Sequence, residues 1–183
     1  MAAELGEGVV EASADPNYGD AALAALALEA GRALRKARQR VAVAESCTGG
    51  LIAKLLTDAP GSSVWFERGI VSYSNEAKQD LLGVSSTTLA THGAVSASVV
   101  LEMVQGLLRR APVEWTLAVS GIAGPDGGTP DKPVGTVWLG FGGRRIASSA
   151  SRLQFSGDRD HVRRASAAAA LRGLRQLLAD TKV

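Results

Sequence analysis

Segments with strand character alternate with segments of helical periodicity along most of the chain, and this alternation restricts the fold more than any other feature. Residues 40–44 form a short β-branched and alanine-containing run, whereas residues 21–38 carry apolar side chains every three or four positions. The predicted strands cover residues 40–44, 64–73, 115–120, 136–141 and 146–155. The predicted helices cover residues 21–38, 51–56, 75–82 and 87–92, a segment from Ser96 to Arg110, and a segment from Asp158 to about Leu178.

Capping and turn residues support this assignment. Ser96 and Asp158 are suited to begin helices, because their side-chain oxygens can accept a hydrogen bond from an unpaired amide of the first turn. Gly142-Gly143 lies between the last two strands and signals a hairpin. Helices between the early strands favour parallel pairing, whereas a hairpin pairs its strands antiparallel. We therefore predict an α/β fold, a three-layer α/β/α sandwich with a mixed, mostly parallel sheet.

The length of 183 residues suits one domain. A single cysteine, Cys47, excludes an internal disulfide, and with two histidines it leaves too few ligands for a typical zinc site. No apolar run reaches the roughly 18 residues of a membrane span. Residues 1–20 are acidic and contain no lysine or arginine, unlike a signal peptide. We expect a flexible acidic tail over residues 1–20, one domain over residues 21–183, and a cytoplasmic protein without metal, cofactor or membrane contact.

The charge is unevenly distributed, although the formal net charge is only +2. The first 20 residues contain five acids, and many arginines lie near the other end: Arg144, Arg145, Arg152, Arg159, Arg163, Arg164, Arg172 and Arg175. A nucleic-acid surface is one interpretation of these arginines. They are not interleaved with aromatic residues and match no nucleic-acid motif. A solvated helix face with a small anion site is therefore the favoured interpretation, and nucleic-acid binding is not expected.

The segment Glu45-Ser46-Cys47-Thr48-Gly49-Gly50 joins a predicted strand to a predicted helix. A serine in such a turn lies at the edge of the sheet, and amides at a helix start can stabilise an oxyanion or a phosphate. Gly49 and Gly50 allow a substrate to approach the main chain closely. The same pattern fits an ordinary glycine-containing turn in which Ser46 and Thr48 are caps, so the residues alone leave both interpretations open.

A serine nucleophile needs a base, and the sequence offers three candidates. His92 and His161 lie in no recognisable triad motif. Lys78 follows a predicted strand, but a lysine acts as a base only when neutral, which requires its pKa to fall from about 10.4 to nearer 7–8. Burial or a nearby cation lowers a lysine pKa in this way. Without that environment, Lys78 is a surface lysine on a short helix. Cys47 is an alternative nucleophile, although a free cysteine is usually a small buried filler.

The segment from Gly121 to Pro130 is dense in glycine and proline and follows a predicted strand. A long loop of this kind in a compact domain is usually functional or disordered. Glycine-rich main chain can cradle a phosphate or a ring, yet the segment matches neither the lysine-containing phosphate loop nor the dinucleotide fingerprint. A purely structural loop is the alternative.

Taken together, these segments resemble the CinA carboxy-terminal domain family over the chain from about Ala21 onward. The matching stretches are Ala44 to Gly50, Tyr73-Ser74-Asn75 with Lys78, Gly93 to Ser96, Ser120 to Gly128, Pro133 to Val137, and Phe155 to Arg159 with Arg163. Each stretch is weak alone, whereas their order along the chain is highly specific. The chain is similar to the stand-alone form of the family, because it has no room for the additional amino-terminal domain of the larger members.

The resemblance implies an amidohydrolase in which Ser46 is the nucleophile and Lys78 the general base. The implied reaction converts nicotinamide mononucleotide to nicotinate mononucleotide and ammonia, without a cofactor. The implied oxyanion and substrate-binding residues are Thr48, Gly49, Gly50, Tyr73, Asn75, Gly121, Gly124, Gly127, Gly128, Arg159 and Arg163. Amides at the start of the helix after Ser46 would hold the oxyanion, and the 124–128 loop with Arg159 or Arg163 would hold the phosphate. A homodimer is also expected from the resemblance.

Two alternatives to this enzyme use the same residues. One is a non-catalytic nucleotide-binding or regulatory module with the same fold, and the other is an amidase for another small amide. The presence of both Ser46 and Lys78 favours an enzyme over the binding module.

Overall fold

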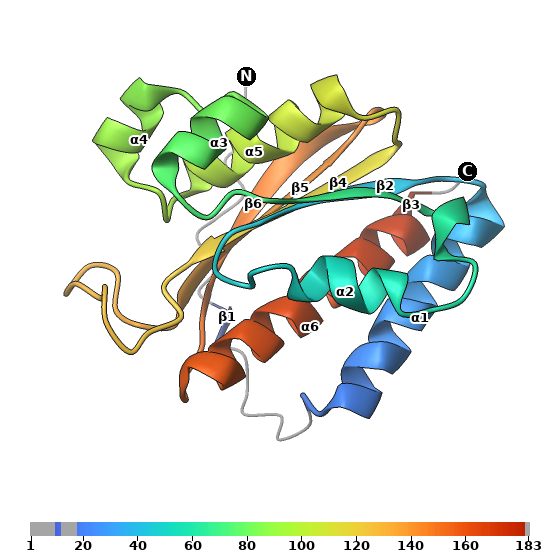
Figure 1. Cartoon of the computed structure of the whole chain (residues 1–183), viewed down its shortest axis with the longest axis horizontal. Coiled ribbons are helices and arrows are strands. Elements are labelled where there is room, and N and C mark those ends of the chain that lie inside the picture. Colours follow the sequence, from blue (N-terminus) through green and yellow to red (C-terminus); the bar gives the residue numbers. More distant parts are fainter. Residues whose placement is uncertain (1–9, 12–17, 182–183) are drawn as a thin grey trace.

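A six-stranded mixed sheet forms the centre of the molecule in the computed structural model, which describes residues 10–11 and 18–181 (Figure 1). The strand order is β1-β6-β5-β4-β2-β3. The strands are β1 (Val10–Glu11), β2 (Val41–Glu45), β3 (Phe66–Val71), β4 (Trp115–Gly121), β5 (Thr136–Gly143) and β6 (Ile146–Gln154). β2 pairs in parallel with both β3 and β4, whereas β5 pairs antiparallel with β4 and β6. This arrangement confirms the predicted mixed α/β sheet.

Helices cover both faces of the sheet, as the three-layer prediction requires (Figure 1). The helices are α1 (Asp20–Ala37), α2 (Leu51–Thr57), α3 (Asn75–Leu82), α4 (Ser86–His92), α5 (Ala97–Arg110) and α6 (Arg159–Asp180), with a short 3-10 turn at Ser62–Val64. One face carries α1, α2 and α6, and the other carries α3, α4 and α5. Each helix or strand predicted from the sequence has a counterpart here, with bounds that differ by at most two residues.

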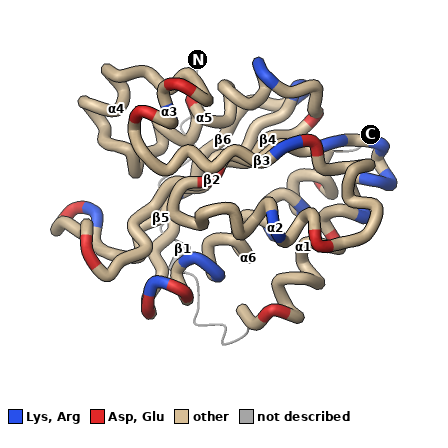
Figure 2. Tube along the Cα trace, viewed as in Figure 1, with Lys and Arg blue, Asp and Glu red and all other residues tan. Residues whose placement is uncertain are grey.

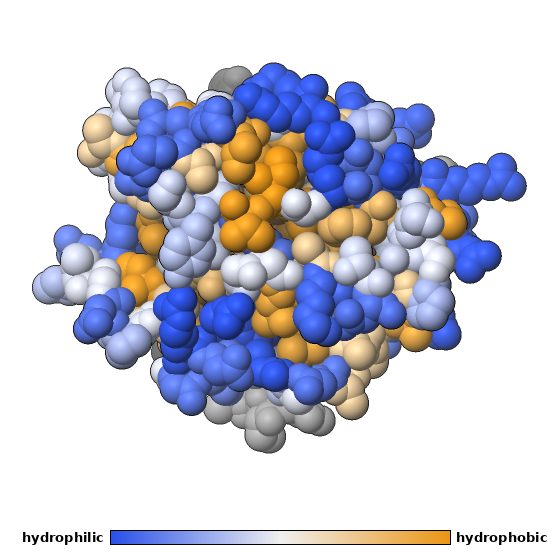
Figure 3. Space-filling view, in the orientation of Figure 1, coloured by the Kyte–Doolittle hydropathy of each residue, from blue (hydrophilic) through white to orange (hydrophobic). Residues whose placement is uncertain are grey.

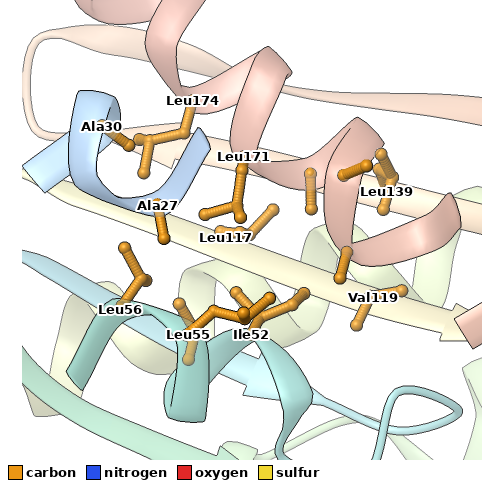
Figure 4. Close-up of a cluster of buried hydrophobic side chains, with 14 of the residues drawn as sticks. Ala27, Ala30, Ile52, Leu55, Leu56, Leu117, Val119, Leu139, Leu171 and Leu174 are labelled. Atoms are coloured by element: carbon orange, nitrogen blue, oxygen red, sulfur yellow. The ribbon is translucent and has the colours of Figure 1, made fainter. Parts of the chain in front are cut away.

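The core has two parts, one on each side of the sheet. The larger part fills the space between the sheet and α1, α2 and α6, where leucine side chains of α2 and α6 meet those of β4 and β5 (Figure 4). The smaller part lies under α5, whose Val99, Val100, Met103, Val104 and Leu107 are all completely buried. Burial of this aliphatic surface is the main stabilising term available to a chain with only 4% aromatic residues.

The parallel register of β2 and β4 places their carboxyl ends side by side. Glu45 pairs with Val119, and the amide of Ser46 donates to the carbonyl of Val119 at 3.1 Å. The turn that follows β2 and the loop that follows β4 therefore leave the sheet at the same edge. This is the edge at which open α/β sheets bind ligands.

The predicted hairpin is present, but its turn is not where the sequence placed it. Gly142 and Gly143 lie inside β5, and the two turn residues are Arg144 and Arg145. The reason is packing: a β-carbon at Gly142 would overlap the side chain of Val104 on α5. The glycine at this position accommodates a helix crossing the strand, and it does not mark a turn.

The first 20 residues are not all separate from the domain. Val10–Glu11 pairs in parallel with β6, Tyr18 is buried in the larger core, and α1 begins at Asp20. The predicted flexible tail otherwise falls on residues 1–9 and 12–17, which lie outside the described residues. Among the helices that the structure describes, none is both long and apolar enough to cross a membrane.

Candidate active site

A pocket of about 270 Å³ opens at the carboxyl edge of β2 and β4. Its walls come from the turn after β2, the start of α3, the segment before α5, the loop after β4 and the first residue of α6. The lining residues are Ser46, Cys47, Tyr73, Lys78, Ala94, Val95, Ser120, Gly121, Ile122, Ala123, Gly124, Asp126, Gly127 and Arg159. The structure therefore brings together seven of the residues predicted for the site: Ser46, Lys78, Tyr73, Gly121, Gly124, Gly127 and Arg159.

Lys78 lies beside Ser46 although 32 positions separate them in the sequence. Ser74 caps α3 by accepting the amide of Ala77, and this cap fixes the helix start from which Lys78 projects inward. The Lys78 Nζ atom lies 3.1 Å from the Ser46 Oγ atom. Lys78 is only 1% exposed and Ser46 is 8% exposed. Lys78 is therefore a buried lysine in contact with the serine, and not the surface lysine of the alternative interpretation.

The partners of Lys78 determine the direction of its lone pair. Nζ donates to the main-chain carbonyls of Ser72 at 2.8 Å and Tyr73 at 3.3 Å. A neutral amine has two hydrogens and one lone pair, and carbonyl oxygens accept but do not donate. In the neutral form, directing both hydrogens at the carbonyls would leave the lone pair for the Ser46 hydroxyl. Burial lowers the pKa of Lys78 below its usual value, which favours this neutral form.

A buried carboxylate occupies the start of the helix after Ser46. Glu45 is completely buried, and its two oxygens accept the main-chain amides of Gly50 at 3.0 Å, Ile52 at 3.1 Å and Ala53 at 2.8 Å. These amides were expected to hold the oxyanion, and that expectation is wrong for these three donors because the chain's own carboxylate occupies them. The amide of Thr48 is a donor of the turn that has no acceptor among the described residues.

An arginine holds the other side of the same turn. Arg163 of α6 donates from Nη2 to the carbonyl of Thr48 at 2.8 Å. Gly49 and Gly50 adopt left-handed φ angles of 60° and 94°, a conformation that glycine adopts without strain. The Thr48 side chain is completely buried, and its hydroxyl has no partner in the described structure. These four predicted site residues do not line the pocket, and instead shape the turn that carries Ser46.

Arg159 bridges two walls of the pocket. Its Nη1 donates to the carbonyl of Gly124, and its Nη2 donates to the hydroxyl of Tyr73, both at 2.8 Å. Asn75 and Gly128 were also predicted for the site, and neither lines the pocket. Asn75 is exposed at the first position of α3, and Gly128 lies against the main chain of Val134.

The other candidates for nucleophile and base either lie outside the pocket or have surroundings that disfavour their reactive form. Cys47 touches the pocket but packs into the larger core, and burial raises the pKa of its thiol to about 12. His92 is exposed at the end of α4. His161 packs edge-on against Tyr18 with the ring centroids 5.3 Å apart. Within the described part of the chain, no group of three histidine, cysteine, aspartate or glutamate residues is placed to hold a metal ion.

Sequence reasoning missed two polar residues of the pocket wall. The Ser120 hydroxyl donates to the carbonyl of Ala94 at 2.8 Å, which ties the end of β4 to the segment before α5. Asp126 is the single carboxylate among the lining residues of the described pocket. Both residues belong to the stretch from Ser120 to Gly128 on which the resemblance rests, so the signal was present. Only glycines were selected from that stretch, because a glycine-rich loop suggests a main-chain cradle.

Comparisons with known proteins identify the family of this chain. The model of the CinA C-terminal domain matches residues 23–178. A nicotinamide-nucleotide amidohydrolase PncC of Escherichia coli K12 is 53% identical over 157 residues, which are 86% of this chain and 95% of the relative. The protein of that name from Pseudomonas putida is 52% identical over 153 residues, covering 83% of this chain and 94% of the relative.

A solved structure shows the same fold. The crystal structure of competence damage-inducible protein A from Klebsiella pneumoniae superposes with a TM-score of 0.84 at 38% sequence identity. The alignment covers 87% of this chain and 99% of that one. The chain belongs to the CinA C-terminal domain family, and it matches the stand-alone relatives over nearly their whole length.

Proposed function

We propose that this protein hydrolyses the carboxamide of nicotinamide mononucleotide, with Ser46 as the nucleophile and Lys78 as the general base. The single observation that carries the proposal is the 3.1 Å approach of a buried lysine Nζ to a serine Oγ inside a pocket. Relatives at 52–53% identity bear the name nicotinamide-nucleotide amidohydrolase, which supports the choice of substrate.

The reaction follows from the Ser46–Lys78 pair. Ser46 Oγ attacks the carboxamide carbon while its proton passes to Lys78 Nζ. Collapse of the tetrahedral intermediate breaks the carbon–nitrogen bond, and Lys78 returns the proton to the leaving ammonia. An ester between Ser46 and the nicotinoyl group remains. Water then attacks this ester with Lys78 again as base, which releases the carboxylate and restores the serine.

The substrate itself assists the base. The pyridinium ring of nicotinamide mononucleotide is cationic, and a cation near Lys78 disfavours its protonated form. The ring charge also makes the carboxamide carbon more electrophilic.

Arg159 is the cation best placed to bind the phosphate. It lines the pocket and is the first residue of α6, where the helix dipole also favours an anion. Arg163 is the weaker candidate, because it lies outside the pocket lining. Loss of a charge-assisted hydrogen bond to the phosphate costs about 1.5–3 kcal/mol, which should lower catalytic efficiency roughly 10- to 150-fold.

The homodimer stays a prediction. β3 forms one edge of the described sheet, and Val71 at its end, Val64 just before it and Leu81 of α3 are between 40% and 55% exposed. The space-filling view shows apolar surface in the middle of this face between hydrophilic margins (Figure 3). Sedimentation over a range of protein concentrations measures the assembly directly, and a monomer at every concentration would contradict it.

The direct test is ammonia release from nicotinamide mononucleotide by the purified protein. The parent should release ammonia, and Ser46→Ala should be slower by at least about 1,000-fold with an unchanged melting curve. Lys78→Met should be similarly inactive, and exhaustive chelation should leave the parent unaffected. Ammonia release that chelation abolishes and added metal restores would exclude the serine–lysine mechanism.

Substrate comparisons separate the two alternatives. A binding module would bind nicotinamide mononucleotide in calorimetry without releasing ammonia. An amidase for another small amide would prefer a different member of an amide panel. Nicotinamide riboside lacks only the phosphate, so it should be the poorer substrate of the parent. Equal turnover of riboside and mononucleotide would contradict the proposal that Arg159 binds the phosphate.

A further inference from the structure

A second and larger pocket, of about 350 Å³, lies at the opposite end of the sheet. It is lined by Ala37, Arg38, Gln39, Glu114, Trp115, Gly143, Arg144, Arg145 and Thr181. β4 runs from Trp115 at this pocket to Gly121 at the catalytic pocket, and seven residues of extended strand span about 20 Å. A ligand in the second pocket therefore does not touch Ser46 or Lys78.

Positive charge dominates this second pocket. Its charged lining residues are three arginines and one glutamate, which gives a net charge of two positive. In the charge-coloured trace, several lysine and arginine segments gather at this end of the molecule, beside the end of the chain marked C (Figure 2). The volume lies within the usual range of small-molecule sites.

The three arginines differ in how they are held. Arg144 is fixed, because its Nε donates to the carbonyl of Val113 at 2.8 Å and its Nη2 to that of Ala111 at 3.0 Å. The side chains of Arg38 and Arg145 are exposed and have no hydrogen-bond or ion-pair partner in the part of the chain that the structure describes. One anchored guanidinium and two free ones provide donors that can converge on a single anion.

Local folding does not explain the arginine at position 38. Arg38 ends α1 with a φ of 55°, in the left-handed region where glycine is preferred and other residues are strained. An arginine there retains a long charged side chain in the lining of the pocket, at a cost to the helix end. Arg40, just beyond it, has a buried Nε with no acceptor among the described residues.

The remaining wall of the pocket is polar and aromatic. The Trp115 indole donates from Nε1 to Gln39 Oε1 at 2.6 Å, so the amide nitrogen of Gln39 remains as a further donor. Glu114 is engaged by the main-chain amide of Arg40 at 2.8 Å, which satisfies part of its charge. The donors available to a ligand therefore exceed the acceptors.

We infer that this pocket is a second binding site, separate from the catalytic one, for a phosphorylated small molecule. Guanidinium groups bind phosphate oxygens through paired, charge-assisted hydrogen bonds, and a multiply charged phosphate matches the excess of positive charge. The site does not depend on the reaction proposed above, because it shares no residue with the catalytic pocket.

Titration calorimetry with inorganic pyrophosphate at low ionic strength tests the inference. The full-length parent should bind pyrophosphate, and Arg38→Gln/Arg145→Gln should bind it at least about 100-fold more weakly, at about tenfold for each charged hydrogen bond removed. Arg159→Ala, altered only in the catalytic pocket, should bind it at this site like the parent. The double variant should keep the parent's rate of ammonia release.

A matched control distinguishes binding at this pocket from non-specific electrostatic attraction of pyrophosphate to a positively charged protein. Lys54→Gln/Arg175→Gln also removes two positive charges, from exposed ion pairs with Asp58 and Glu29 elsewhere on the surface. This control should bind pyrophosphate like the parent. The inference is overturned if the parent does not bind, if both double variants weaken equally, or if Arg159→Ala abolishes all binding.

Discussion

The turn after β2 and the loop after β4 leave the same edge of the sheet and line the same pocket, but different groups hold them in place. Charged side chains fix the turn from both sides: Glu45 binds three amides, and Arg163 binds the Thr48 carbonyl. Main-chain bonds close the base of the loop, where Gly135 donates to Ile122 at 2.7 Å and Ile122 donates to Thr136 at 2.9 Å.

The difference follows from what each segment carries. The turn carries the nucleophile, and a displacement of about 1 Å at a reacting atom can cost a hundredfold in rate. Charge-assisted bonds hold such an atom more firmly than bonds between neutral main-chain groups. The loop carries glycines and exposed residues that shape a pocket wall, and one arginine, Arg159, ties it to Tyr73. The turn therefore holds the nucleophile in a fixed position, whereas the loop forms the shape of the pocket wall.

The largest effect should come from breaking the turn. Glu45→Ala leaves three buried or part-buried amides without an acceptor, at roughly 1–3 kcal/mol for each such group. We expect a loss of about 3 kcal/mol in the free energy of unfolding and a melting temperature lower by about 10 °C. Ammonia release should fall with it, because the turn no longer holds Ser46 in place.

Two variants make this result specific. Glu45→Gln provides one acceptor oxygen where the carboxylate provides two, so its melting temperature should lie between those of the parent and Glu45→Ala. Asp126→Ala alters an exposed residue of the loop and should melt within about 2 °C of the parent. If Glu45→Ala melts like the parent, the helix start does not depend on the carboxylate.

The second prediction concerns the base that faces the turn. Burial lowers the pKa of Lys78, and only the neutral amine accepts the Ser46 proton. Activity should therefore rise with pH through this lowered pKa and then level off. Lys78→Arg should be inactive at every pH, because the guanidinium stays charged. A parent profile without a rising limb would contradict the assignment.

The same pKa shift predicts a change in stability with pH. Between the lowered pKa of Lys78 and its unfolded value of about 10.4, the unfolded chain binds more protons than the folded one. The free energy of unfolding contributed by Lys78 should therefore increase as the pH rises through this window. Lys78→Met should lack this increase when melting is measured against pH in parallel with the parent.

The third prediction compares the two arginines at the start of α6. Arg163→Gln removes a charged hydrogen bond from the turn, so kcat should fall roughly 10- to 100-fold while KM changes little. Arg159→Gln acts on the pocket wall and the phosphate, so KM for nicotinamide mononucleotide should rise and the advantage over the riboside should narrow. The opposite pattern in kcat and KM would exchange the roles of the two residues.

Local signals predicted the fold, because the groups that end helices act within a few residues. Ser96 accepts the amide of Val99, Asp158 accepts that of His161, and Gly83 ends α3 in the left-handed conformation. The glycine pair at 142–143 was misread as a turn because its cause is distant: α5 crosses β5 there. Packing between segments far apart in the sequence leaves no local pattern.

The residues of the site also divide into those that the sequence indicated and those whose roles depend on distant partners. The resemblance indicated Ser46 and Lys78, and the structure places them in contact. The roles of Arg159 and Arg163 could not be separated by sequence, since the two residues are one helical turn apart and their partners lie 35 and 115 positions away. Glu45 is different: its partners are only five to eight positions away, but a carboxylate beside a nucleophile also suggests a pocket acid.

The smallest effect should come from the residue next to the nucleophile. Cys47 belongs to the rigid turn but directs its side chain into the core, where it is 5% exposed. Cys47→Ala should keep ammonia release within about threefold of the parent and cost about 1 kcal/mol of stability, as loss of a small buried group does. Because burial raises the pKa of the thiol to about 12, very little of it is thiolate at pH 8. Alkylation by iodoacetamide, followed by mass spectrometry, should therefore be far slower than for an exposed cysteine. The enzyme should keep its activity during the treatment. Rapid alkylation with parallel inactivation would mean that the turn opens in solution, and the contrast between a fixed turn and a shaped loop would then fail.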